Sequence, residues 1–356
     1  MIYFLIGIAS LALLVDICLL VLWKDDTLSD TTAPLKKVSV LIAARNEAAN
    51  IKACLQSLIR QDYPNELVQI LVGDDQSEDE TYQLAKDELQ HNSNSKVLKI
   101  ERNVGHQKGK ANVLAQLANQ ASGDVFLITD ADMQLPASWV RSMVGSLKNE
   151  GIVTGVTYVE GNNYQSIDWI FSLGIIKVLK DVGQPVTTMG NNMMITKKAY
   201  QAVGGYESIP FSITEDFELF KHVRNKGFDI VQLFNPAVLG KTKPVSGFIN
   251  LLNQRKRWMK GAVQLPKLIV LLLLVQALYF PALILLISYN LQLGLSLMII
   301  KILFQTFFIL RCLNSLELKY SFGQLIIYEF YSIIVSLSSA IYYLLPAKVS
   351  WKGRKY

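Results

Sequence analysis

Two carboxylates stand one residue apart where an apolar segment ends. Asp130 and Asp132 follow the run VFLIT at residues 125–129, and two anions this close repel each other unless a cation or water lies between them. Residues i and i+2 of an extended chain point to the same side. Oxygen ligands without His or Cys suit a hard divalent cation, Mg2+ or Mn2+. The spacing therefore predicts a metal site; the alternative is a loop acid pair that caps a helix at Pro136.

More charged and polar groups follow the neighbouring apolar segments. They are Arg45, Asn46, Glu47, Asp74, Asp75, Lys108 and Lys110. Two lysines near two aspartates would add positive charge for a phosphate group, which Mg2+ usually keeps as one of its ligands. Together these residues favour a site for a metal and a diphosphate over the loop alternative.

The elements that must position these groups alternate between strands and helices. Apolar runs predict strands, and amphipathic stretches predict helices. The expected strands are 38–43, 68–73, 97–100 and 125–129, and the expected helices lie near 48–61, 79–90, 110–121 and 136–149. This pattern predicts an α/β domain with a parallel sheet covered on both faces, whose ligands bind beyond the carboxyl ends of the strands. Neither GxGxxG nor GxxxxGK[ST] is present, which disfavours a dinucleotide site or a phosphate loop.

The two ends of the chain are apolar. Hydrophobic residues make up 51% of the 356 residues, and residues 2–23 suffice to cross a bilayer, which takes about 20 residues. They lack the basic start and cleavage site of a signal peptide. Three more apolar runs are 268–287, 291–310 and 325–346. We expect an anchor at 1–24, a catalytic domain at 36–245, a basic interfacial helix at 246–267, transmembrane or re-entrant helices at 268–346, and a basic tail at 347–356.

Charge and cysteine content indicate the compartment and the partners. The net charge is +6, and residues 241–267 hold seven Lys or Arg and no acid. Because a membrane run follows, this patch is expected to contact anionic lipid headgroups rather than nucleic acid. Basic residues beside membrane runs favour the cytosolic side. Three cysteines and three histidines without paired spacing predict neither a disulfide framework nor a zinc site.

In the order of its motifs the chain resembles the membrane-anchored family-two glycosyltransferases of GT-A fold, among them ceramide glucosyltransferases and cellulose, hyaluronan and chitin-oligosaccharide synthases. The motifs are ARNEAANI, GDDQSEDET, GKAN, TDADMQLP, TEDFEL and QRKRW, and the resemblance covers residues 36–262. It implies a Rossmann-like GT-A domain with one N-terminal transmembrane helix and a C-terminal membrane bundle. It also implies an inverting transferase with a UDP-sugar donor and a divalent cation.

The resemblance assigns roles to particular residues. Asp216 would be the catalytic base, and Asp130 and Asp132 would hold the metal. The nucleotide would contact Ala43, Arg45, Glu47, Asp74, Asp75, Lys108, Lys110, Asp130 and Ala131. The acceptor and the diphosphate would contact Gly190, Asn191, Asn192, Glu215, Gln254, Arg257 and Trp258. Acids in a first helical turn are also common for structural reasons, with Thr214 as the expected cap, and a Trp beside basic residues is typical of an interfacial helix.

The acceptor class divides the functional hypotheses. A processive synthase needs a water-filled route through the bilayer. At most four spans are few helices to enclose such a route. We therefore expect a membrane lipid acceptor at the cytosolic face, with a small processive polysaccharide synthase as the alternative. A non-catalytic scaffold that binds nucleotide sugars is a third class. The protein would be integral to the membrane, the inner membrane in a bacterium.

Two features of the membrane part need explanation. Three C-terminal spans after a cytosolic domain would leave the tail outside, yet Lys348, Lys352, Arg354 and Lys355 favour the cytosol. One run is therefore expected to be re-entrant or interfacial, and Pro281 marks a candidate. Asp16, Lys301 and Glu329 lie within apolar runs, where charge is costly, so they are expected to pair with one another or to meet an acceptor headgroup. The alternative is simple placement near a helix end, which fits Glu329 best.

Overall fold

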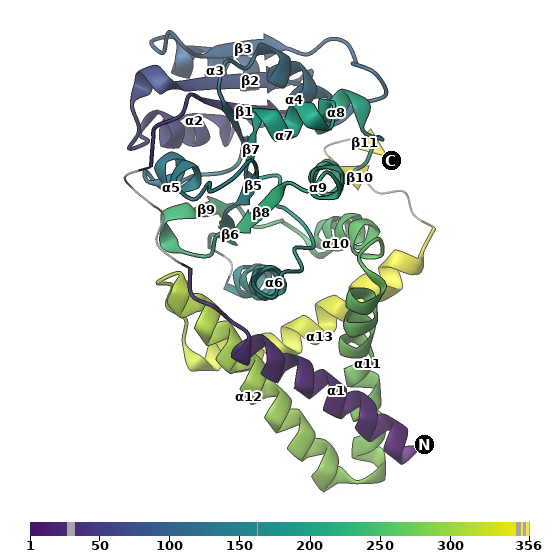
Figure 1. Cartoon of the computed structure of the whole chain (residues 1–356). Helices are drawn as coiled ribbons and strands as arrows, with labels where there is room; N and C mark the ends of the chain where they lie inside the picture. The colour runs from purple at the N-terminus through teal and green to yellow at the C-terminus, as the bar shows by residue number, and fades with distance from the viewer. Residues whose placement is uncertain (27–32, 162, 347–349, 352–353, 356) are drawn as a thin grey trace. The chain divides into compact units, whose positions relative to one another are not determined.

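The computed structural model describes residues 1–26, 33–161, 163–346, 350–351 and 354–355. The chain divides into two compact units, whose elements are labelled in Figure 1. The sheet unit comprises Asp26–Gly161 and Thr187–Lys243. The helical unit comprises Met1–Asp25, Asn162–Val186 and Pro244–Tyr356.

The sheet unit is built on a seven-stranded sheet of order β3-β2-β1-β4-β7-β5-β8. Its strands are β1 Val38–Ala44, β2 Val68–Asp74, β3 Lys96–Lys99, β4 Val125–Asp130, β5 Gly151–Thr154, β7 Asn192–Thr196 and β8 Asp229–Gln232. The first four pair in parallel, as the sequence predicts. In their register Ala43 lies opposite Asp130, and Ala44 lies opposite Asp74. The carboxyl ends of β1, β2 and β4 thus meet at one edge of the sheet.

The other half of the sheet departs from the predicted parallel arrangement. Strand β7 runs antiparallel to both β4 and β5, while β8 is parallel to β5. A mixed sheet needs no helical crossover at each step, so the alternation of apolar runs and helices that identifies the first half is missing here. A second small sheet pairs β6 (Val156–Val159) with β9 (Leu239–Thr242) in parallel.

Helices cover the sheet through apolar side chains at helical spacing. The helices of this unit are α2 Ile51–Ile59, α3 Thr81–Leu89, α4 Gly109–Gln120, α5 Trp139–Gly145, α7 Lys197–Ala202, α8 Gly205–Ser208 and α9 Glu215–Asn225. Val113, Leu114 and Leu117 of α4 are fully buried against Leu71 of β2 and Phe126 of β4. Burying such side chains contributes roughly 1.5–3 kcal/mol each, which fixes the start of α4 beside the sheet edge.

Two of the predicted helices are shorter than expected. Residues 48–50 form a turn before α2, and the backbone N–H groups of Asn50 and Ile51 donate to the carbonyl of Glu47. Helix α5 begins at Trp139, three residues after Pro136, and ends at Gly145. The acid pair at 130–132 therefore does not cap a helix at Pro136, because that proline lies outside the helix.

The helical unit contains six long helices within the described residues. They are α1 Ile2–Val21, α6 Asn163–Asp181, α10 Phe248–Ala262, α11 Lys267–Tyr289, α12 Leu291–Ser315 and α13 Phe322–Leu344. Four of them, α1, α11, α12 and α13, are long and apolar enough to cross a membrane. Helix α11 continues through Pro281 without a break, so the proline does not divide this run. Of the basic tail, only β10 (Ser350–Trp351) and β11 (Arg354–Lys355) are described; Lys348 and Lys352 lie outside the described residues.

Candidate active site

Lys110 joins three segments at the carboxyl edge of the sheet. Its Nζ lies 2.6 Å from Oδ1 of Asp130 at the end of β4 and 3.2 Å from Oε1 of Glu215 at the start of α9. It also donates to the carbonyl of Gly190, at 3.1 Å. Lys110 lies in the first turn of α4, which the apolar contacts of that helix hold against β2 and β4. The structure thus brings together four residues that the sequence predicts for the site.

Acids around Lys110 outnumber it. Burial alone would lower the pKa of Lys110, but the negative charges of Asp130, Glu215 and Asp216 outweigh burial and raise that pKa above its ordinary value. Lys110 is therefore a permanent cation at neutral pH. Among the described residues of this cluster, three carboxylates lie around one ammonium, and this acid-rich composition favours a cationic ligand.

Asp216 is held in place through both of its carboxylate oxygens. Oδ2 accepts a hydrogen bond from the backbone N–H of Gly190 at 2.8 Å, and Oδ1 accepts one from Phe217 N–H at 2.8 Å. A Cβ on residue 190 would lie only 2.8 Å from the Cβ of Asp216, so only glycine fits there without displacement. Thr214 occupies the N-cap position of α9, but its side chain makes no capping hydrogen bond. Asp216 supplies that contact instead, since it is the residue that bonds a first-turn N–H.

Asp130 and Asp132 lie half-buried where β4 ends. Beside the contact of Asp130 with Lys110, Oδ2 of Asp132 accepts a hydrogen bond from Thr242 at 3.3 Å. Cys54 lies beneath them, and its thiol pKa is raised by burial and by the charges of Asp132, Asp130 and Glu47. Three carboxylates thus lie near this one buried thiol.

The carboxylates fit a divalent cation only in part. Among the described residues no group of three or more His, Cys, Asp or Glu side chains is placed to hold an ion by itself. Mg2+ is commonly held by one or two carboxylates together with substrate phosphates and water rather than by an all-protein cage. Two half-buried aspartates in an acid-rich edge match that arrangement, so Asp130 and Asp132 suit an ion that arrives with a diphosphate.

The loops after β1 and β2 are bound to each other. Nη1 of Arg45 donates to the carbonyl of Asp75 at 2.7 Å, and the backbone N–H of Asn46 donates to the hydroxyl of Ser77 at 3.0 Å. Asn46 has a left-handed backbone, with φ of 53°; its side chain accepts from Glu78 N–H at 2.9 Å. Strain of this kind persists only where the surroundings enforce it.

Three buried polar atoms in these loops have no hydrogen-bond partner. They are the acceptors Oδ1 of Asp74 and Oδ1 of Asn50 and the donor Nε of Arg45. An unsatisfied buried polar atom is costly, and such atoms mark a place where a ligand completes the bonding. Asp74 and Asp75 are both buried at the end of β2, so a ligand with hydrogen-bond donors would satisfy the unpartnered oxygen of Asp74.

Some predicted residues lie away from this cluster. Asn192 is fully buried: its Oδ1 accepts from Trp139 Nε1 at 2.8 Å, and its Nδ2 donates to the carbonyls of Val156 and Val238. The polar atoms of this side chain are therefore bound within the protein, so Asn192 is not available to bind an acceptor substrate. Ala131 is buried as well.

Three other predicted residues lie nearer the edge. Lys108 is exposed at the N-cap of α4. The carbonyl of Asn191 accepts from Thr129 at 2.9 Å. Ala43 is half-buried in β1, opposite Asp130 in the register of the sheet.

The basic segment with the QRKRW motif lies in α10 of the helical unit. Arg255 pairs with Asp168 of α6 and stacks over the ring of Trp258, 4.4 Å from its centroid. Lys256 is buried and donates to the carbonyls of Tyr342 and Leu345. These two cations therefore bind within the protein, and the expectation that the whole patch contacts lipid headgroups is wrong for them. Gln254, Arg257 and Trp258, the predicted functional members, are half-buried.

Two site residues were not predicted from the sequence. Thr242, which bonds Asp132, comes from β9, and no motif marks it. Tyr206 is buried with a raised pKa, caused by burial first and then by the charge of Glu215; its hydroxyl has no hydrogen-bond partner. A buried Tyr hydroxyl normally finds a partner. In the sequence, Tyr206 is marked only by the preceding pair Gly204 and Gly205. Such a pair is equally typical of an ordinary turn.

The charged residues predicted within the apolar runs are paired in the helical unit. Nζ of Lys301 in α12 lies 2.6 Å from Oδ2 of Asp16 in α1, and Gln276 of α11 accepts from the same ammonium at 2.8 Å. Glu329 of α13 accepts from Gln305 of α12. The expected pairing of Asp16 with Lys301 is confirmed. Glu329 is buried two turns inside its helix, so placement near a helix end does not explain it.

Comparisons with known proteins agree with this geometry. The model of glycosyl transferase family group 2 matches residues 125–343, and that of glycosyl transferase family 2 matches residues 39–204. A beta-monoglucosyldiacylglycerol synthase from Synechocystis is 28% identical over 246 residues, covering 66% of this chain and 49% of that protein. A poly-beta-1,6-N-acetyl-D-glucosamine synthase from Staphylococcus epidermidis is 26% identical over 232 residues, covering 63% of this chain and 54% of that protein. The chain thus spans about half the length of these relatives.

A solved structure shares the fold along almost the whole chain. It is a mannosyltransferase from Pyrobaculum calidifontis in complex with GDP-Man and Mn2+, with a TM-score of 0.61 and 17% sequence identity. The likeness covers 96% of this chain and 95% of that one. At this identity the likeness concerns the fold alone, and it confirms the predicted GT-A type of α/β domain with added apolar helices.

Proposed function

The chain belongs to glycosyl transferase family group 2, and from that premise we propose that it transfers one sugar from a UDP-sugar to a membrane lipid at the cytosolic face, inverting the anomeric carbon. The observation that carries the proposal is the acid cluster around Lys110 at the carboxyl edge of the sheet. Ligands of such sheets bind at that edge.

The proposed sugar transfer needs a general base, and Asp216 is the candidate. In the proposed reaction the acceptor hydroxyl oxygen attacks the anomeric carbon while the bond to the diphosphate oxygen breaks and its electron pair leaves with UDP. The proton of the hydroxyl passes to Asp216. The bonds from Gly190 and Phe217 orient this carboxylate without neutralising it, because both are single N–H donors.

The leaving diphosphate gains negative charge, which the site must stabilise. Lys110 is the buried cation at the edge, and a divalent ion on Asp130 and Asp132 would supply Lewis-acid stabilisation when bound. We propose that Arg45 and Asp74 contact the uracil and the ribose, because their unpartnered atoms offer a donor and an acceptor. Gln254, Arg257 and Trp258 remain predictions for the diphosphate and the acceptor.

A donor and acceptor screen tests this function. Purified full-length protein is incubated with radiolabelled UDP-sugars or GDP-sugars, total membrane lipid and Mn2+. We expect label from a UDP-sugar in the organic phase, lost in Asp216→Asn. Label that precipitates as polymer would instead support the second candidate, a processive synthase, which the likeness to the Staphylococcus enzyme favours. UDP binding without any transfer would support a non-catalytic scaffold.

The metal is tested separately by calorimetry. Because Asp130 and Asp132 would be its only protein ligands, Asp130→Ala and Asp132→Ala should each weaken UDP binding in Mn2+ by about tenfold, the size of one lost charge-assisted contact. Binding without Mn2+ should change less. Equal affinities with and without Mn2+ in the wild-type protein would contradict the metal proposal.

A further inference from the structure

Both ends of α13 are bound to other helices of the same unit, α6 and α10. Near its start, Tyr320 donates to Ser166 and Tyr328 donates to Asp168, both in the first turns of α6. At its end, Tyr342 donates to Asn253 of α10, and the carbonyl of Leu345 accepts from Lys256. These contacts span the full length of a helix of 23 residues, which is about 34 Å at 1.5 Å per residue.

The polar groups at the two ends belong to one connected cluster. Arg255, the neighbour of Lys256 in α10, pairs with Asp168 of α6, the residue that also accepts from Tyr328. If α13 crossed the bilayer, its ends would lie on opposite sides of about 30 Å of hydrocarbon. The cluster would then have to extend through that hydrocarbon with three charged side chains, which lipid strongly disfavours.

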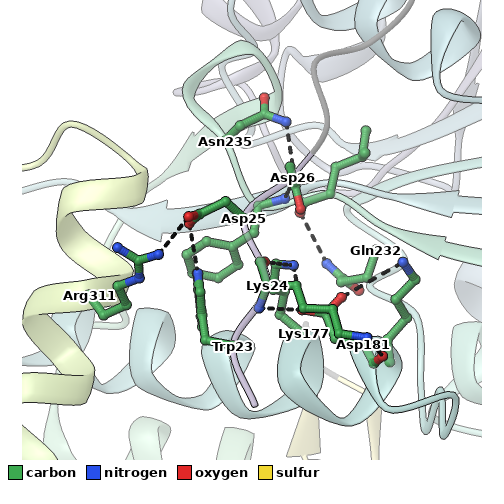
Figure 2. A network of polar contacts seen from close by, with 12 residues as sticks. Trp23, Lys24, Asp25, Asp26, Lys177, Asp181, Gln232, Asn235 and Arg311 are labelled. Carbon is green, nitrogen blue, oxygen red and sulfur yellow. Dashed lines mark hydrogen bonds and ion pairs between the residues drawn. The ribbon is translucent and has the colours of Figure 1, made fainter. Parts of the chain in front are cut away.

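Helix α6 lies at the polar end of the crossing helices. Figure 2 shows Lys177 of α6 beside the residues that follow α1, and its Nζ lies 2.6 Å both from the carbonyl of Lys24 and from Oδ2 of Asp181. Asp25 pairs with Arg311, near the end of α12, at 2.6 Å. Charged groups thus collect where α1 and α12 end, and α6 carries part of that charge. A helix bound along α6 and α10 is therefore held at the membrane boundary.

Helix α13 has two different faces. One face is buried and includes Tyr328, Glu329, Val335 and Ser339. The opposite face carries exposed apolar side chains at helical spacing: Ile327, Phe330, Ile334, Leu337, Ile341 and Leu344. By contrast, one apolar cluster among the described residues of this unit is formed by side chains of α1, α11 and α12. In Figure 1, α13 crosses these helices instead of running alongside them.

We propose that α13 lies in the plane of the membrane, with its apolar face in the acyl chains of one leaflet and its buried face on α6, α10 and α12. An in-plane amphipathic helix of this kind needs one apolar face and one polar face. The chain then crosses the bilayer three times, through α1, α11 and α12, and the tail stays on the side where α13 begins. This accounts for the basic tail, and it replaces Pro281 of α11 as the site of the non-crossing run. The proposal does not depend on the reaction catalysed.

Depth measurements by spin labelling test the proposal directly. Cys18 is replaced by Ser, and the buried Cys54 and Cys312 are checked by mass spectrometry to stay unmodified in the full-length protein in liposomes. Nitroxides are placed at Ile327, Ile334 and Ile341 on one face of α13, and at Leu271, Leu278 and Leu285 of α11 as a matched control. All six side chains are between 47% and 65% exposed. If a label prevents folding, Phe330 or Leu337 replaces that position.

The expected result is a flat profile in α13 and a peaked one in α11. Relaxation by oxygen and by a water-soluble nickel complex should place the three α13 labels at one shallow depth, while Leu278 lies deeper than Leu271 and Leu285. A central maximum at Ile334 would overturn the proposal, since a crossing or re-entrant helix gives that profile. Protection of all three α13 labels from oxygen would also overturn it, because a second copy of the chain would then cover the face.

Sidedness gives an independent test. Single cysteines at Lys319, before α13, and after Tyr356, at the C-terminus, should react with an impermeant maleimide from the same side of sealed vesicles. A cysteine at Leu291, the first residue of α12, should react only from the opposite side. Labelling of the C-terminal cysteine from the side of Leu291 would contradict the in-plane helix.

Discussion

The two units each bury a lysine against carboxylates, but the two sites differ in balance. In the helical unit, Lys301 and Asp16 are 4% and 2% exposed, and one ammonium meets one carboxylate with Gln276 as a neutral third partner. In the sheet unit, Lys110 is 10% exposed and its partner Asp130 is 34% exposed, with Glu215 as a second partner. The first pair is closed and neutral, whereas the second is open and carries excess negative charge.

This difference separates a structural ion pair from a site prepared for a ligand. A neutral, fully bonded pair between α1 and α12 has no remaining charge to offer, so its effect is on the assembly of the helices. At an accessible sheet edge, carboxylates in excess repel one another until a cation or a proton binds. The comparison predicts that changes at the first pair alter stability, while changes at the second alter binding and turnover.

The largest effect is expected on turnover in the sheet unit. Asp216→Asn keeps the shape of the side chain but removes the base, so transfer should fall by about 10²–10⁴-fold, the usual contribution of a positioned base. UDP affinity by calorimetry and the unfolding temperature should stay near those of the wild type. Unchanged turnover would remove Asp216 from the base role and would leave the acid cluster without a catalytic part.

A large effect on stability is expected at the closed pair. Lys301→Met leaves Asp16 buried without its cation and should destabilise the protein by about 3–5 kcal/mol. The double variant Asp16→Asn with Lys301→Met removes both charges and should regain most of that loss in thermal unfolding. Residual transfer per folded molecule should not change in either variant. A double variant as unstable as the single one would show that the pair stabilises the bundle beyond charge balance.

The sequence predicts the first half of the sheet well because its signal is local. The apolar runs from 38 to 129 are β-branched and alternate with helices, so strands β1 to β4 and the charged residues after them follow from periodicity alone. Strands β5, β7 and β8 are four or five residues long and pair with mixed direction, which no local pattern records. Asp130 and Lys110 were therefore predictable, while Thr242 of β9 was not.

In the helical unit the sequence predicts length but not orientation. All four apolar helices are long and apolar enough to cross a membrane. Helix α13 is distinguished from the other three by the contacts of its buried face. Those contacts, such as Tyr328 with Asp168 and Lys256 with Leu345, join residues 89 to 160 positions apart. Similarly, the basic motif suggested headgroup contact, yet Arg255 and Lys256 are bound by partners that only the fold brings near.

A moderate effect is expected from one methyl group at Gly190. The added Cβ of Gly190→Ala would lie 2.8 Å from the Cβ of Asp216 and must push that side chain away. Overpacking of this kind costs about 1 kcal/mol, so we expect a loss of roughly fivefold in turnover. Gly323→Ala is the matched control, because an added Cβ there meets nothing within 4 Å. Equal turnover in both variants would show that the position of Asp216 is not limiting.

The smallest effect is expected from pH, and it tests the pairing of Lys110 with its acids. Since acids raise the pKa of Lys110 in the folded protein, its pairing stabilises the fold fully below the unfolded pKa of about 10.4 and is lost as pH rises through the folded value. Between pH 6 and 9 the unfolding temperatures of the wild type and of Lys110→Arg should therefore run parallel. Above about pH 10.4 the wild type should lose stability relative to the arginine variant, which stays charged. A divergence near pH 7 would mean that burial, and not the acids, governs Lys110, and the open site would then lack the permanent cation proposed for the diphosphate.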